Sequence, residues 1–170
     1  LQLPVGTIEQ QDFINAMWRV EGLAVLAWAL GRYELPPDDE LVVPVDLYHA
    51  MGILDAESGH QLLSTPVVRP DSELESMQTH LFMLHWRLRN YSLRPSPMDF
   101  VDFSKSCWFG SFDISGFQIM NGDLAIGGKP IDNADEELRG IVHSLAMERH
   151  LAANWLRGES SIYSETDTST

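Results

Sequence analysis

Two helical stretches far apart in the chain carry charged residues where their neighbours are apolar. The first, residues 18–31, reads WRVEGLAVLAWALG, and the second, residues 146–156, reads AMERHLAANWL. A charge on an apolar helix face is costly unless it is paired. The sequence therefore predicts that the two stretches pack together in one core and that their Arg and Glu side chains form ion pairs.

Helical periodicity selects the charges that most need partners. Arg19 shares a helix face with leucines, and Glu148 and Arg149 fall in a gap of the apolar stripe of the second stretch. Two pairings satisfy these charges, Arg19 with Glu148 or Glu21 with Arg149, and both use the favoured Arg–carboxylate geometry. We interpret the cluster first as a salt bridge that specifies the fold, because most buried pairs are structural. The alternative is a polar pocket in which the same charges face a ligand.

Apolar periodicity and helix-boundary signals predict a mainly helical chain. The expected helices cover residues 7–30, 44–51, 70–91 and 133–157, with a further turn over 55–63 and a short helix that begins near Ser96. Capping boxes are expected at three helix starts, formed by Thr7 with Gln10, Ser96 with Asp99, and Asn133 with Glu136. The predicted hydrophobic centre is Leu23, Leu26, Trp28, Leu81, Leu84, Val142, Leu145 and Trp155.

Residues 117–126 have the pattern of a β-hairpin. Asn121-Gly122 accepts the positive φ angles of a type I′ turn, and we expect Gly127-Gly128 to break the second strand. The predicted fold class is therefore mainly α, a helical bundle-like single domain over residues 1–158 with one small antiparallel β-hairpin. Residues 159–170 are rich in Ser, Thr and acidic residues, and we expect them to form an exposed coil.

The charge balance of the chain restricts its partners. Acidic residues outnumber basic ones by 25 to 11, which gives a formal net charge of -14. A field of this sign repels nucleic acid and anionic membranes, and it favours a basic protein partner. Arg87, Arg89 and Arg94 lie close together in sequence, and we interpret them as a solvated helix end rather than as a nucleic-acid site.

The cysteine content and the apolar runs bear on localisation. Cys107 is the only cysteine, so an intramolecular disulfide is impossible, and we expect a cytoplasmic location. The longest apolar run, residues 23–30, is far shorter than the roughly 20 residues that span a membrane. The first residues lack a basic segment followed by an apolar one, so no secretory signal peptide is expected.

Histidines are the strongest candidates for acid–base chemistry in this sequence. His150 and Asn154 are four residues apart on one helix face, and His143 precedes them by two turns. His85 lies at the edge of the apolar stripe of its helix. A histidine near a Glu side chain is able to act as a base, but a hydrogen-bonded structural histidine is the favoured interpretation. His80 and His85 are five apart and do not share a face, so we expect no metal site and no cofactor.

Three familiar catalytic patterns are incomplete in this sequence. The glycine-rich segment 122–129 lacks the spacing and the Ser or Thr of a phosphate-binding loop. The sequence contains no Gly-x-Ser-x-Gly elbow. Cys107 next to Trp108 is interpreted as a small core residue rather than as a nucleophile.

Several segments together resemble the family called domain of unknown function 4272. They are residues 18–31, HWRLR at 85–89, GDLAIGG at 122–128, the ERH and ANWL segments within 148–156, and YSETDT at 163–168. The resemblance covers nearly the whole chain from about Ile14. It implies one compact domain of a mostly bacterial family, and it assigns no catalytic residue because the family has no established activity.

Two classes of function agree with these observations. The first is a non-catalytic cytoplasmic binding or protein-interaction module, which fits the incomplete catalytic patterns. The alternative is an enzyme or small-molecule binder with a polar cleft between the first and last long helices. The residues that would line this cleft are Arg19, Glu21, Glu148, Arg149, His150 and Asn154, with His85 as a further contributor.

Overall fold

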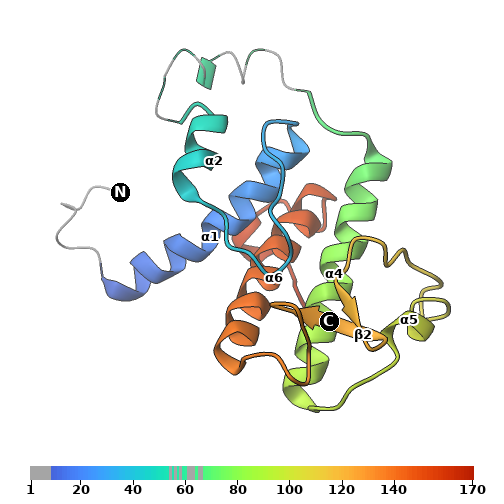
Figure 1. Ribbon diagram of the computed structural model, residues 1–170. Coiled ribbons are helices and arrows are strands. Elements are labelled where there is room, and N and C mark those ends of the chain that lie inside the picture. Colours follow the sequence, from blue (N-terminus) through green and yellow to red (C-terminus); the bar gives the residue numbers. More distant parts are fainter. Residues whose placement is uncertain (1–8, 54, 56, 58, 61–63, 65–66) are drawn as a thin grey trace.

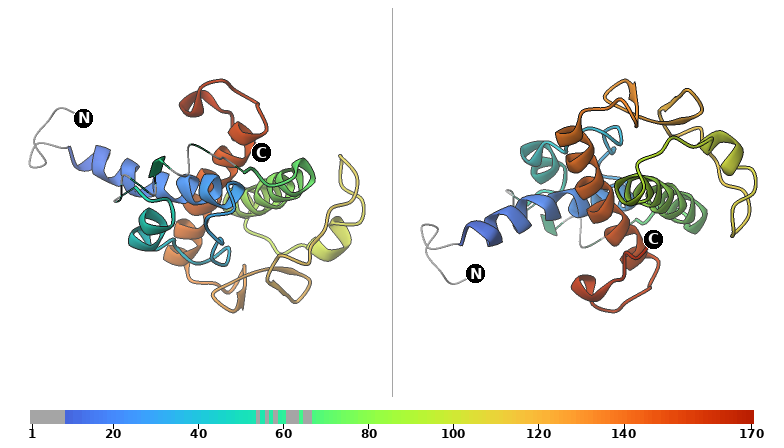
Figure 2. Two further views of the ribbon diagram at one scale, coloured as in Figure 1. Left: turned by 90° about the horizontal axis from the view of Figure 1, so that it is seen from above. Right: turned by 90° about the horizontal axis from the view of Figure 1, so that it is seen from below.

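Three long helices form the body of the molecule. The computed structural model describes residues 9–53, 55, 57, 59–60, 64 and 67–170. The long helices are α1 (Gln10–Ala29), α4 (Asp71–Leu93) and α6 (Glu136–Leu156), and α6 packs against both of the others (Figure 1). The two turned views show α6 crossing α1, while the N-terminal half of α1 projects away from the body (Figure 2). The predicted packing of the first and last helices is confirmed.

A small antiparallel sheet lies beside the helices. Its strands β1 (Ile119–Met120), β2 (Asp123–Ile126) and β3 (Lys129–Pro130) are paired in the order β1-β2-β3. Asn121 and Gly122 have φ angles of 55° and 83°, so the predicted hairpin turn is confirmed. Gly127-Gly128 ends the second strand as predicted, and positive φ angles at both glycines turn the chain into a third strand, β3, that the sequence did not predict.

The shorter elements connect and cover these parts. Helix α2 (Pro44–Ala50) confirms the prediction for 44–51 and has Pro44 in its first turn, where the missing N–H costs nothing. Two further short elements are the one-turn helix α5 (Phe100–Phe103) and the 3₁₀ turn η2 (Tyr163–Glu165). Part of the segment 55–63 lies outside the described residues. None of the helices in the described part of the chain is long and apolar enough to cross a membrane.

Two of the three predicted capping boxes are wrong. Helix α5 begins after Asp99, whose carboxylate accepts a hydrogen bond from the Asp102 N–H at 2.7 Å. Helix α6 begins after Asp135, which accepts from the Leu138 N–H at 3.0 Å. In both cases an Asp closer to the first helical turn caps it in place of the predicted residue. Thr7 of the third box lies outside the described residues.

The core is built around small residues of α1 and large residues of α4. Of the predicted centre, Trp28, Leu81, Leu84, Val142 and Leu145 are buried. Leu23, Leu26 and Trp155 are only partly buried. The face of α1 that turns inward consists of smaller residues, Ala24, Val25, Ala27 and Ala29. These small side chains allow α6 to approach closely, which leaves the leucines at the margin.

The C-terminal segment 159–170 is largely exposed coil apart from η2, as predicted, but it folds back on the body, which the sequence did not predict. The Tyr163 ring packs against Trp155 at a centroid distance of 5.7 Å, and its hydroxyl lies where a Cβ on Gly22 would be. At the end of the chain, Arg89 Nη1 donates to the Thr170 carbonyl oxygen at 3.1 Å. This segment therefore forms part of the surface around α4 and α6.

Candidate functional site

An open pocket of about 250 Å³ lies between α4, α6 and the folded-back C-terminal segment. Its lining residues are Gln78, Thr79, Phe82, Phe109, His150, Asn154, Glu159, Asp167 and Ser169. Two of the predicted site residues, His150 and Asn154, are among them and lie on the same face of α6. The pocket joins α6 to α4, whereas the sequence analysis expected a cleft between α1 and α6.

A hydrogen-bonded amide network forms one wall of the pocket. Gln78 Nε2 donates to Asn154 Oδ1 at 3.0 Å and to Glu159 Oε1 at 2.8 Å. Asn154 Nδ2 in turn donates to the Asp167 carbonyl oxygen at 2.9 Å. These contacts tie α4, α6 and the C-terminal segment together, so the wall is organised in the absence of a ligand.

Aromatic rings line the pocket one helical turn away from the amides. Phe82 meets Phe109 edge to face at a centroid distance of 6.0 Å and meets the His150 ring at 5.5 Å. Phe109 remains 45% exposed, so its ring surface is accessible to a bound molecule. These rings offer apolar contact and the negative face of an aromatic ring.

The charge at the mouth of the pocket is negative. The carboxylates of Glu159 and Asp167 are exposed there, and no Lys or Arg is among the described lining residues. Hydrogen bonds from the Ser169 hydroxyl and N–H hold the pKa of Asp167 below its ordinary value. Asp167 is therefore ionised at neutral pH and favours a positively charged group in the pocket.

Behind the pocket, His150 forms a buried pair with His85. Their Nδ1 atoms are 3.2 Å apart, so one ring donates a hydrogen and the other accepts it. Burial lowers the pKa of each histidine to about 4; for His85 the neighbouring His150, His143 and Arg89 act in the same direction. For His150 the nearby Asp167 and Asn154 oppose the shift without overcoming it. Both rings are neutral at pH 7.

The third histidine, His143, extends this cluster along α6. Its ring centroid lies 5.3 Å from that of His85, and its Nε2 is buried without a hydrogen-bond partner in the described structure. Within the described residues no group of three or more His, Cys, Asp or Glu is placed to hold a metal ion. Burial and the charge of Arg89 lower the pKa of His143 as well.

The histidine pair predicts a specific pH dependence of stability. The unfolded chain takes up protons on His85 and His150 near pH 6.5, whereas the folded protein takes them up only near pH 4. The unfolded state therefore binds more protons between these values, and the free energy of unfolding falls as the pH is lowered from about 6.5 to about 4. We expect a loss on the order of 3 kcal/mol for one fully shifted histidine.

Urea denaturation at a series of pH values measures this slope. The double variant His85→Gln/His150→Gln is expected to flatten it, while His49→Gln, an exposed histidine of α2, leaves it unchanged. An unchanged slope in the double variant would show that other groups cause the pH dependence.

The predicted pair of Glu21 and Arg149 is confirmed. Arg149 Nε and Nη2 approach Glu21 Oε2 at 3.0 and 2.9 Å, and both side chains are almost completely buried. Glu21 Oε1 also accepts from the Val42 N–H at 2.9 Å, and Arg149 Nη2 donates to the Glu40 carbonyl oxygen at 2.9 Å. The two charges are thus saturated by protein groups, and they hold the segment 36–42 against α1 and α6.

The other predicted pair, Arg19 with Glu148, is not formed. Arg19 is exposed, and no ion pair within 4.0 Å joins it to Glu148 in the described structure. Burial raises the pKa of the half-buried Glu148, and Arg19 lowers it only in part. The predicted cluster thus separates into three groups. Glu21 and Arg149 form a structural pair, Arg19 and Glu148 interact only weakly, and His150 and Asn154 lie at the pocket.

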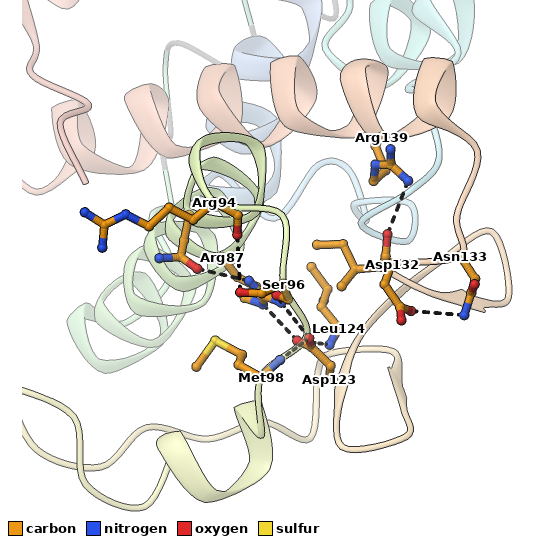
Figure 3. Close-up of polar contacts among 11 residues, drawn as sticks. Arg87, Arg94, Ser96, Met98, Asp123, Leu124, Asp132, Asn133 and Arg139 are labelled. Atoms are coloured by element: carbon orange, nitrogen blue, oxygen red, sulfur yellow. Dashed lines mark hydrogen bonds and ion pairs between the residues drawn. The ribbon is translucent and has the colours of Figure 1, made fainter.

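A buried ion pair between Arg87 and Asp123 was not predicted from the sequence. Arg87 is fully buried, so its interpretation as part of a solvated helix end is wrong. Its Nε and Nη2 donate to Asp123 Oδ1 and Oδ2 at 2.8 and 2.5 Å (Figure 3). The one available signal was its position within the apolar stripe of its helix, between Leu84 and Leu88.

Asp123 also organises the chain around the sheet. Its carboxylate accepts from the backbone N–H groups of Met98 and Leu124 at 2.9 and 2.8 Å. Arg87 Nη2 donates further to the Ser96 carbonyl oxygen at 3.0 Å (Figure 3). This pair joins α4, the loop before α5 and β2, and it lies apart from the pocket.

A second missed contact joins His80 to Asp38. His80 Nε2 lies 2.9 and 3.0 Å from the two carboxylate oxygens, and the ring stacks on Phe117 at 4.1 Å. No local pattern connects α4 with the acidic loop 38–40, because the contact depends on where Arg149 holds that loop.

The fold and the site define a small, mainly α-helical domain with a minor antiparallel sheet and an open, negatively charged pocket at the junction of two helices. Residues 3–103 match the model of the family described as Domain of unknown function (DUF4272). The chain belongs to this family, and the motifs at 18–31 and 85–89 lie within the matched residues, whereas those at 122–128, 148–156 and 163–168 lie outside them. No curated protein and no solved structure gives a significant match.

Proposed function

We propose that this protein is a non-catalytic binding domain whose pocket between α4, α6 and the C-terminal segment binds a small organic cation. The observation that carries the proposal is the combination of an aromatic wall with the two exposed carboxylates of Glu159 and Asp167. The ligand would place a flat apolar group against Phe82 and Phe109 and a cationic donor group near the carboxylates. The volume of about 250 Å³ favours a molecule of one ring and a short polar group.

Two observations favour binding over catalysis. A general base works best with a pKa near the working pH, and His150 has a pKa of about 4. The strongest charges of the predicted cluster, Glu21 and Arg149, are occupied by each other and by backbone groups. The groups that remain for a ligand supply hydrogen bonds, stacking and charge attraction.

The single free thiol, Cys107, supports a cytoplasmic setting for this role.

Calorimetric titration with three molecules of the same shape tests the proposal. Benzamidinium is cationic, benzamide is neutral and benzoate is anionic. We expect benzamidinium to bind about tenfold more tightly than benzamide, because attraction to the two exposed carboxylates raises the affinity by about that factor. Benzoate should bind least, because the same carboxylates repel it. Added salt should reduce the difference, since the carboxylates are exposed.

Two double variants that remove the same number of negative charges show whether a cationic ligand is attracted by the pocket carboxylates or by the net charge of the protein. Glu159→Gln/Asp167→Asn should remove the preference for benzamidinium over benzamide. Glu165→Gln/Asp132→Asn changes two exposed acids that do not line the pocket and should keep the preference. Equal binding of all three molecules by the parent protein, or no binding of any, would overturn the proposal.

A further inference from the structure

A second, apolar groove lies at the opposite end of the molecule, between the N-terminal half of α1 and the segment that leads into α2. It has a volume of about 440 Å³. Its lining residues are Phe13, Ile14, Met17, Trp18, Val20, Glu21, Leu41, Val42 and Pro44. The half of α1 that forms one wall projects from the three-helix body (Figure 2).

The groove exposes more large apolar side chains than a solvated helix end needs. Phe13 is 59% exposed, Met17 is 49% exposed and Leu41 is 52% exposed, and all three line the groove. A contiguous apolar surface of this kind on a chain with strong net charge is typical of an interaction site. The floor is rigid, because Glu21 fixes Val42 and is itself fixed by Arg149.

The spacing of the apolar residues on α1 favours a helical partner. Phe13, Met17 and Val20 follow one another at steps of four and three, so they form a single row along the helix. Seven residues of helix are about 10 Å long, which matches two turns of a second helix lying in the groove. Amphipathic helices bind grooves of this kind through anchors with the same spacing.

The residues around the groove favour a basic partner. Segments 9–18 and 38–50 contain acidic residues but no Lys or Arg, and the nearest basic residue on α1 is the exposed Arg19, at the end of the first segment away from Glu9 and Asp12. Glu9, Asp12, Glu40 and Asp46 are exposed in these two segments. Acidic residues flanking an apolar groove attract Lys and Arg at the edges of an amphipathic helix, and they oppose a second copy of this acidic chain.

We propose that the groove between α1 and the segment 41–45 is a docking site for a basic amphipathic helix of a protein partner. The apolar face of that helix contacts Phe13, Met17 and Leu41, and its basic residues lie beside Glu9 and Asp12. This site is separate from the small-molecule pocket and does not depend on it.

Fluorescence anisotropy with a synthetic peptide tests the proposal on the full chain. The probe is a labelled amphipathic helix of leucine and lysine about four turns long, and the comparison peptide has glutamate in place of lysine. We expect the lysine peptide to bind and the glutamate peptide to bind at least tenfold more weakly. Phe13→Ser/Met17→Ser removes two exposed anchors and should weaken binding of the lysine peptide by at least tenfold.

Matched charge variants show whether the attraction is local. Glu9→Gln/Asp12→Asn should weaken binding several-fold, whereas Asp132→Asn/Glu137→Gln, at the start of α6, should not. Circular dichroism checks that each variant keeps its helices. Unchanged binding by Phe13→Ser/Met17→Ser would overturn the proposal. So would a parent protein that sediments as a dimer and becomes a monomer in that variant, because the groove would then belong to a second copy.

Discussion

Replacing Arg87 by alanine is expected to lower the free energy of unfolding by about 3–5 kcal/mol. The substitution leaves the Asp123 carboxylate buried at the junction of α4 and β2 without its charged partner. It also removes the donors to the Ser96 carbonyl oxygen and to Asn90 Oδ1. An unpaired buried charge cannot recover its solvation, so the penalty is far larger than for an exposed pair.

Urea denaturation at pH 7 measures this effect, with Arg94→Ala as the matched control. Arg94 follows the end of α4 and its side chain is exposed, so its removal should change the free energy of unfolding by less than about 0.5 kcal/mol. Arg87→Lys keeps the positive charge but not the two-pronged geometry, and it should recover only part of the stability. Equal stability of Arg87→Ala and Arg94→Ala would contradict the structural role of the pair.

The second large effect is expected at Arg149. Arg149→Ala leaves the Glu21 carboxylate buried without its charged partner, at a cost of about 3–5 kcal/mol. It also frees the loop at residues 36–40, because Arg149 donates to the carbonyl oxygens of Pro36, Pro37 and Glu40. The loss should therefore be accompanied by faster proteolysis in that loop.

A comparison with two further variants identifies the cause. Arg19→Ala removes an exposed charge of α1 and should be nearly neutral. Glu21→Leu/Arg149→Met replaces both charges by apolar groups and should be more stable than Arg149→Ala, since no charge remains buried. A double variant as unstable as Arg149→Ala would show that packing, rather than the unpaired carboxylate, dominates the loss.

The long helices and the hairpin were predictable because each has a local cause in the sequence. The steps of three and four along α4 and the Asn121-Gly122 turn act within a few residues, and both predictions are confirmed. The Glu21–Arg149 pair was also predictable, since each charge interrupts an apolar face and few partners are available to it.

The pocket was predictable only in part, because its walls come from three separate elements. His150 and Asn154 share a helix face, and the sequence analysis selected them for that reason. Gln78 meets them through the packing of α4 on α6, and Glu159 and Asp167 reach the same place only because the C-terminal segment folds back along both helices. No local pattern specifies that return, since it depends on contacts such as Tyr163 over Gly22 that are distant in sequence. Arg87 was misjudged for the same reason, as its partner Asp123 lies on β2, 36 residues further along the chain, and is held there by contacts such as the Met98 N–H to its carboxylate.

A nitrogen-15 NMR titration of the full chain with benzamidinium at pH 7 tests the location of the cation-binding site directly. We expect shifts in the side-chain amide signals of Gln78 and Asn154 and in the backbone signals around Phe82, His150 and Asp167. Signals of the N-terminal half of α1 and of α2 should remain in place. Shifts confined to α1 and α2, or none up to a concentration that saturates the calorimetric binding, would contradict the assignment of this pocket as the ligand site.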